Sequence, residues 1–251
     1  MRPSPTLRNL RRMGFHLNID VTYRVADRQL PTIESEYNRL WQYASVLTRA
    51  GLPVDKWYPA ADTEEASLLT PAFDAHGPTS AAIAMAKNFP LSNGTSVRSL
   101  GVWNGLEGDG GAAFSDSQSI DSVCSVTFQM KGIVGFQHST LVTEVVSEAA
   151  RIWSASSVQV GPFKYFSQQQ LFEKRPGAGW MLYLPRILTV QQLPEARELI
   201  PVMDGMRQIG TLIVSVVDEP FSSSKPEHVK IANDIEKRLV NQDLLPLFTE
   251  L

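Results

Sequence analysis

The chain has 251 residues, of which 43% are hydrophobic and 20% are charged, and its net charge is −3. This composition is typical of a folded domain with an adequate core and excludes a disordered chain. The negative balance disfavours direct binding of nucleic acid, which a basic surface would mediate. Cys124 is the only cysteine, so the chain forms neither an intramolecular disulfide nor a cysteine zinc site.

The N-terminal residues are basic and contain two prolines, and we expect residues 1–13 to form a flexible arm. They lack the apolar stretch of a secretory signal. No later window holds the roughly 20 apolar residues that cross a bilayer. We therefore expect a cytoplasmic protein that does not associate with membranes. The sequence does not indicate an oligomeric state.

Two clear periodicities occur early in the chain. Residues 15–23 alternate between apolar and polar side chains, which predicts a half-buried strand. An apolar stripe at helical spacing predicts a helix over residues 32–50, and Gly51 follows it where a C-cap glycine belongs. Asp62 or Thr63 is a suitable cap for a further short helix, with two acids in its first turn.

The rest of the chain mixes strands and helices without strict βαβ alternation. The expected strands are residues 97–103, 120–130, 158–160, 180–184 and 211–217, and the expected helices are 80–88, 139–153 (capped by Ser139) and a last one from Pro226. We expect a turn at residues 201–205. This pattern predicts an α+β fold, a mostly antiparallel sheet with helices packed against it. One domain over residues 14–251 accounts for it, with two α/β halves meeting near residue 135 as the alternative.

The stretch 100–115 reads LGVWNGLEGDGGAAFS and combines an aromatic residue, Trp103, with two acids, Glu107 and Asp109. Its Asn-Gly pair lies between apolar runs and predicts a hairpin connection, because both residues tolerate positive φ. Residues 99–130 contain no lysine or arginine. A local excess of acids attracts basic partners and repels nucleic acid. An ordinary solvated acidic face is the alternative interpretation.

Patterns that would indicate catalysis or metal binding are weak. His76 and the acids of residues 62–65 match no known ligand spacing, and the acids already suit the start of a helix. Cys124 lies within an expected strand without a neighbouring histidine, and the pair Asp116 and Asp121 is of a kind found in most proteins of this size. The glycine-rich run lacks a Gly-Lys-Ser/Thr ending, so it is not a phosphate loop. We expect no enzyme activity, no metal and no cofactor.

Three aromatic residues lie near turns and caps instead of within periodic stripes. They are Trp57, Tyr58 and Trp103. Tyrosine and tryptophan often carry the binding energy of protein interfaces. Burial in the core is the alternative for each of them, because large aromatic side chains are mostly buried.

The central part of the chain contains several short motifs. They are Trp57-Tyr58, Glu64-Glu65-Ala66, Ala72-Phe73-Asp74, Gly77-Pro78, Gly101-Val102-Trp103-Asn104-Gly105 and Gly111-Ala112-Ala113-Phe114. Together they resemble the immunity protein 52 family of bacterial polymorphic toxin systems. The resemblance implies an α+β fold, with Trp103 as the characteristic tryptophan of the family and Gly108-Asp109 as its Gly-Asp motif.

The resemblance also implies a partner, a cognate toxin with a restriction-endonuclease-like nuclease domain, often delivered by type VI secretion. The expected mechanism is stoichiometric inhibition, and the acidic stretch could enter the basic cleft with which a nuclease binds DNA. The expected toxin-binding residues are Trp57, Tyr58, Asp62, Glu64, Glu65, Trp103, Asn104, Glu107, Asp109 and Asp116. Two alternatives are an effector-binding adaptor or scaffold that does not inhibit, and a hydrolase that uses a carboxylate pair.

Overall fold

The structure is a computed structural model that describes residues 15–25, 29–88 and 97–251. The expected arm at residues 1–13 lies outside this described part. Across these three ranges, none of the helices combines the length and the apolar character that crossing a membrane requires.

Antiparallel pairing links nine described strands into one sheet, and β1 lies at its centre between β7 and β8. In spatial order the strands are β10 (Glu198–Asp204), β11 (Arg207–Val214), β9 (Met181–Leu184), β8 (Ser157–Gly161), β1 (His16–Tyr23), β7 (Cys124–Lys131), β6 (Ala112–Ser119), β5 (Val97–Trp103) and β2 (Tyr58–Pro59). A separate small hairpin pairs β3 (Phe73–Asp74) with β4 (Gly77–Pro78).

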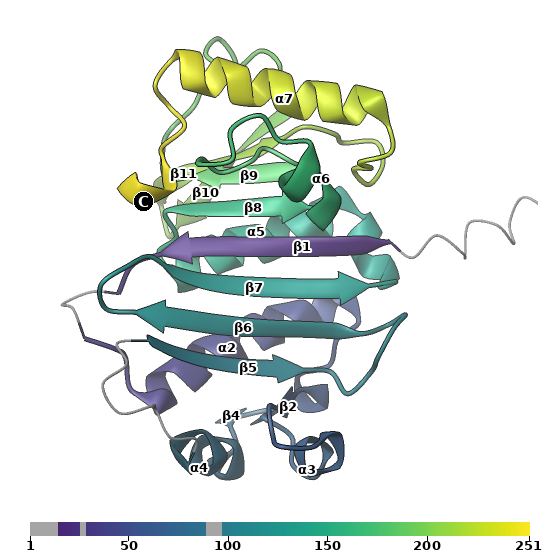
Figure 1. The fold of residues 1–251 in the computed structure, drawn as a ribbon, viewed down its shortest axis with the longest axis vertical. Helices are drawn as coiled ribbons and strands as arrows, with labels where there is room; N and C mark the ends of the chain where they lie inside the picture. The colour runs from purple at the N-terminus through teal and green to yellow at the C-terminus, as the bar shows by residue number, and fades with distance from the viewer. Residues whose placement is uncertain (1–14, 26–28, 89–96) are drawn as a thin grey trace, which may run out of the picture.

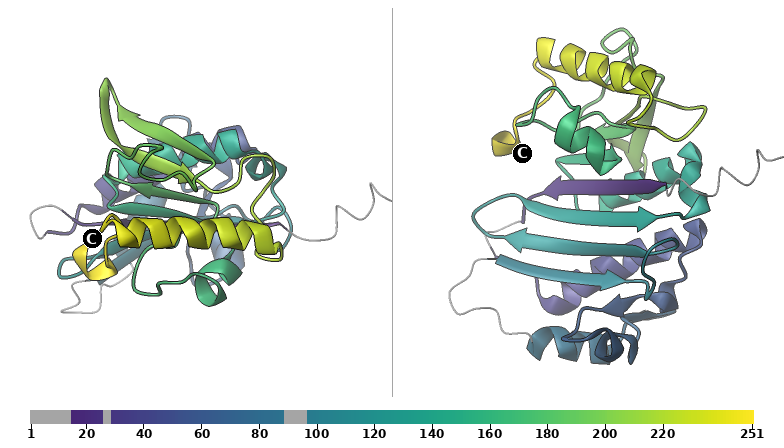
Figure 2. Two further views of the ribbon diagram at one scale, coloured as in Figure 1. Left: turned by 90° about the horizontal axis from the view of Figure 1, so that it is seen from above. Right: turned by 45° about the vertical axis from the view of Figure 1, so that its right-hand side comes forward.

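The helices cover the two faces of the sheet unequally. In the described residues they are α2 (Ile33–Leu47), α3 (Glu64–Leu68), α4 (Ser80–Asn88), α5 (Ser139–Ile152), α6 (Phe163–Gln168) and α7 (Pro226–Asn241). Figure 1 shows α2 and α5 behind the sheet, whereas α6 and α7 lie in front of its upper part. The turned views of Figure 2 agree, and they leave the front of β5, β6 and β7 without a covering helix.

Burial along the strands follows this arrangement. Every residue of β8 and of β9 is buried, because helices lie on both faces of that part of the sheet. In β7, buried residues alternate with exposed or half-buried ones along the whole strand. An antiparallel sheet that is covered on one face shows this alternation. The uncovered face of β5, β6 and β7 is therefore a real surface of the protein.

Aromatic side chains anchor α2 to the covered face. Tyr43 of α2 makes edge-to-face contacts with Phe114 of β6, with Trp153 after α5 and with Phe128 of β7, at centroid distances of 5.5, 5.3 and 6.2 Å. Trp57 adds a fourth contact, 4.7 Å from Phe114. Such pairs contribute about 0.5–1.5 kcal/mol each beyond the burial of their area. This aromatic cluster holds α2 against the covered face of β6 and β7.

The α+β class with a mostly antiparallel sheet is confirmed, and two local predictions need correction. The expected turn at residues 201–205 is the end of an edge strand, β10, where Pro201 is tolerated because an edge position needs no second ladder bond. The turn falls at Gly205, whose φ is +59°. Ser139 is the first residue of α5 and not its cap, since His138 occupies that position without a side-chain hydrogen bond.

Candidate functional site

The loop between β5 and β6, residues 104–111, is held by the side chain of Asn104. Its Nδ2 donates to the carbonyl of Gly110 (2.8 Å), and its Oδ1 accepts from the backbone N–H of Ala112 (2.9 Å). A backbone bond from Asn104 to the Ala112 carbonyl (2.9 Å) closes the hairpin beneath it. The expected Asn-Gly connection is thus present, but asparagine acts mainly through its amide, which ties both ends of the loop together.

The same loop packs against the chain that follows β2. Gly105 has a φ of +73°, and a Cβ atom there would lie 3.0 Å from Leu68 and 3.1 Å from Tyr58. Trp103 pairs with Tyr58 across β5 and β2. The indole of Trp103 donates to Ser67 Oγ (2.8 Å). The structure therefore brings Tyr58, Trp103 and the loop together, as one unit with α3.

Exposed carboxylates surround this unit. Glu107 and Asp109 are exposed on the loop, and Asp109 lies 3.5 Å from Lys131 Nζ. The acids of residues 62–65 are exposed at the start of α3, where Thr63 caps the helix by accepting from Ala66 N–H (3.1 Å). Leu106 is 56% exposed among them. We call these two groups of acids, together with Leu106, the acidic rim (residues 62–65 and 106–109).

Two of the expected binding residues are not on the surface. Trp57 is fully buried against Phe114, and Asp116 is also fully buried. Trp57 precedes β2 by one residue, so the pairing of β2 with β5 turns its side chain inward while Tyr58 remains half-buried. The expectation of surface contact is corrected for both residues. The other eight stay predictions, with their side chains exposed or half-buried.

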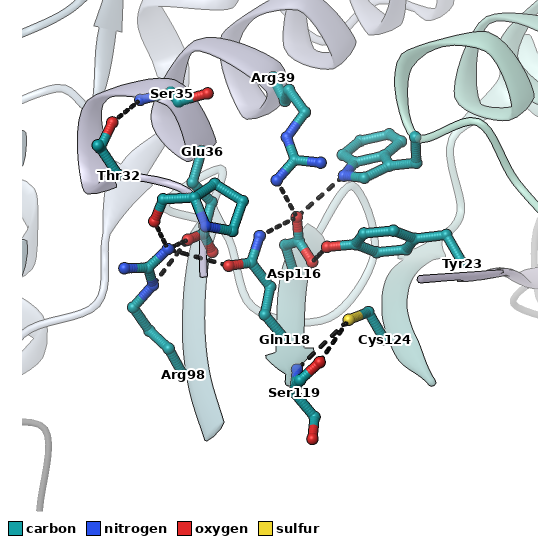
Figure 3. A network of polar contacts seen from close by, with 12 residues as sticks. Tyr23, Thr32, Ser35, Glu36, Arg39, Arg98, Asp116, Gln118, Ser119 and Cys124 are labelled. Atoms are coloured by element: carbon teal, nitrogen blue, oxygen red, sulfur yellow. Dashed lines mark hydrogen bonds and ion pairs between the residues drawn. The ribbon is translucent and has the colours of Figure 1, made fainter. Parts of the chain in front are cut away.

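Asp116 belongs to a polar network between α2 and the sheet (Figure 3). Its carboxylate accepts hydrogen bonds from Tyr23 Oη (2.6 Å) and Trp153 Nε1 (2.9 Å). Beside it Glu36 of α2 accepts from Arg98 of β5, at 2.8 Å from Nε. Burial raises the pKa of Asp116 against the lowering effect of these donors. This network joins the helix to the strands.

Burial also raises the pKa of Glu36 to about 8, with the neighbouring charge of Asp116 as a second cause. Arg98 lowers that pKa but does not outweigh the desolvation. Asp121 is exposed whereas Asp116 is buried, so the carboxylate pair considered for a hydrolase does not share a site. Among the residues that the structure describes, no three histidine, cysteine or acidic side chains converge as metal ligands.

The front face holds a groove that the sequence did not reveal. Its volume is about 830 Å³, and its floor includes Ala113 and Gln129. Trp103 and Leu106 form one wall, and Phe163 of α6 contributes to the opposite wall. A weak signal exists in the sequence, because small or polar residues occupy the outward positions of two successive strands. Only the tertiary structure shows that α6 stands across from the loop.

The fold and this surface define a class, an α+β protein whose antiparallel sheet is covered by helices along one face and only in part on the other, which presents a groove. The model of one family, immunity protein 52, matches residues 32–247. The chain belongs to this family. The resemblance based on the central motifs is thereby confirmed over most of the chain.

A solved structure has a similar fold. The Pseudomonas aeruginosa T6SS protein PA0821 superposes with a TM-score of 0.52 at 11% sequence identity, over 90% of this chain and 73% of that one. At this identity the likeness concerns the fold. No curated protein sequence matches the chain.

Proposed function

We propose that the protein binds the nuclease toxin encoded by the neighbouring gene and neutralises it stoichiometrically in the cytoplasm, without catalysis. Membership of the immunity protein 52 family supports a toxin as partner. The fold shared with a T6SS protein supports a secretion-linked setting. A nuclease as the target, and delivery by type VI secretion, belong to the proposal.

The observation that carries the proposal is the acidic rim. Its carboxylates are exposed and lie on a backbone held by Asn104 and by the Trp103–Ser67 bond. Loops held in one conformation lose less entropy on binding than mobile ones. A nuclease must present positive charge to bind DNA, so an acidic rim complements it and speeds association. The rim would then compete with the DNA backbone for the same basic surface.

Growth protection tests the proposed function. The toxin gene is expressed in a bacterial host with and without this chain, and the proposal expects growth to be restored only when the chain is present. An adaptor that binds without inhibiting would bind the toxin but leave the host unprotected. A toxin that kills equally well in the presence of the chain would refute the proposal.

A charge-reversal pair tests the rim. The double variant Glu107→Lys with Asp109→Lys is expected to weaken toxin binding at least tenfold, because two repulsive contacts replace two attractive ones. The matched control reverses two exposed acids on the far edge strand β10, Glu198→Lys with Asp204→Lys. The control should bind like the parent. Equal affinities for all three proteins would place the interface elsewhere.

A further inference from the structure

The front face of the sheet is poor in charge for a solvent surface. Along β5, β6 and β7, all of which are described, the outward side chains include only one that is charged, Lys131. Small residues such as Ser99, Ala113, Ser115 and Ser125 occupy most of the others. Roughly a quarter or more of a typical soluble surface is charged. Depletion of charged residues is a compositional mark of the core of a protein interface.

The groove on this face has apolar walls that stand above a low floor. Phe163 is 68% exposed on the α6 side, and Leu106 is 56% exposed on the loop side. Exposed large apolar side chains on both walls of one groove are unusual unless a ligand or partner covers them. Between them the floor consists of short side chains, so the backbone of a bound segment can approach the sheet.

Strand register fixes the width of the groove. One row of paired residues runs from Trp103 on β5 through Ala113, Gln129 and Asn18 to Gly161 on β8. Neighbouring strands lie about 4.8 Å apart, so this row spans about 19 Å. An α-helix with its side chains is about 10–12 Å across. The row therefore accommodates one helix together with the side chains of the two walls.

The charges beside the two walls differ in sign, and Lys131, which also lines the groove, pairs with Asp109 on the side of the loop. Glu107 and Asp109 are exposed beside the wall formed by the loop. Lys164, next to Phe163, is exposed and lines the opposite wall. A helix bound between these walls would complement their charges best if it carried basic residues on the flank toward the loop and acidic residues on the flank toward α6.

We propose that the groove receives one amphipathic α-helix of the protein partner, with its apolar stripe on Leu106, Phe163 and the sheet. The flank of that helix facing Glu107 and Asp109 carries lysine or arginine, and the flank facing Lys164 carries acids. This inference rests on the proposed function, because it takes the toxin as the source of the helix. It adds the shape and chemistry of the segment that is bound.

A pair of arginine substitutions tests whether the groove is occupied. Ala113→Arg places a long charged side chain on the floor, whereas Ser125→Arg places the same side chain on the same exposed face but outside the groove. Against the toxin of the neighbouring gene, Ala113→Arg is expected to weaken binding at least a hundredfold and Ser125→Arg less than threefold. Circular dichroism and thermal unfolding check that both variants fold.

Photocrosslinking tests what occupies it. In one variant, a benzophenone amino acid replaces Phe163 in the groove wall. In the control variant, it replaces Ile187, which is 66% exposed and does not line the groove. Mass spectrometry of the complex should identify a toxin peptide linked at 163, helical in the toxin and bearing apolar residues at i, i+3, i+4 and i+7 with basic residues on one flank. Position 187 should not capture it.

Several outcomes would overturn the inference. In the crosslinking experiment, position 163 could capture a strand or loop of the toxin, residues 1–14 of the chain itself, or a second copy of the chain. In the binding experiment, the two arginine variants could bind the toxin with equal affinity. If the parent chain does not bind or protect against the toxin at all, the proposed function fails first. If the parent chain binds and protects while the groove variants bind equally well, only the helix inference fails.

Discussion

Glu36→Gln should change how the stability of the protein depends on pH. Glu36 is fully buried on α2, and its pKa is raised from 4.5 to about 8, chiefly by burial. In the unfolded chain the carboxyl group loses its proton near pH 4.5, whereas in the folded protein it keeps the proton to about pH 8. The stabilisation from this group is therefore fully present below pH 4.5 and is lost as pH rises through 8.

The size of the effect follows from the same pKa. One pKa unit corresponds to about 1.4 kcal/mol, so ionised Glu36 is up to roughly 5 kcal/mol less favourable in the folded protein than in the unfolded chain. Glutamine keeps the shape of the protonated acid and cannot ionise. Between pH 5 and pH 8 the parent should therefore lose about 2–4 kcal/mol of unfolding free energy relative to Glu36→Gln.

Urea denaturation at pH 5, 6, 7 and 8 measures this difference. Glu34→Gln is the control, because Glu34 lies on the same helix, is exposed, and has a pKa lowered by Lys87. Its titration lies below the range of the experiment, so its curve should run parallel to that of the parent. The reasoning is refuted if the difference between the parent and Glu36→Gln stays constant from pH 5 to pH 8.

Three further predictions concern the loop, the helix α7 and the interface. Gly105→Ala should destabilise the protein by about 1–3 kcal/mol, because the position combines a positive φ with contact between the new Cβ atom and Tyr58. Gly108 also has a positive φ, but no atom lies near the Cβ that alanine would add, so Gly108→Ala should cost less. Thermal unfolding of both variants compares the two costs. Glu236→Ala removes the acceptor of the Ala178 N–H (2.9 Å) and should speed amide hydrogen exchange around that residue, which a mass-spectrometric exchange experiment would detect. Toxin binding through the acidic rim should weaken as salt rises from 50 to 500 mM, mainly through slower association, and a salt-independent rate constant in stopped-flow mixing would contradict the electrostatic argument.

Much of the fold could be predicted because its signals are local. The alternation over residues 16–23 gives β1 its buried face, and the apolar stripe after Thr32 gives α2, whose cap bond from Ser35 N–H to Thr32 Oγ1 (3.1 Å) is present. Gly51 ends this region with a φ of +90°, as expected for a C-cap glycine. These features depend on neighbours within a few residues, where periodicity and capping chemistry act directly.

The candidate site was predicted only in part, for a physical reason. Glu107 and Asp109 are exposed as expected, because a polar, glycine-rich loop tip has little apolar surface to bury. For Trp57 the sequence left interface contact and burial open, and the residue packs against Phe114 in the core, where the pairing of distant strands leaves room for a large aromatic side chain. Asp116 is charged in type but buried, because Tyr23 and Trp153, which are far away in the chain, donate hydrogen bonds to its carboxylate.

The sequence alone determined the fold class, the elements with clear periodicity, the acidic stretch and the resemblance to a family, which the match over residues 32–247 then confirmed. Only the tertiary structure decided which face of the sheet stays uncovered (Figure 1). It also brings Phe163 and Leu106, far apart in the sequence, to the lining of one groove. The strand order depends on contacts between distant parts of the chain, such as those of Ile19 on β1 with Phe128 on β7 and Val160 on β8. Such contacts leave no local periodicity in the sequence, so the surface they build appears only when the chain has folded.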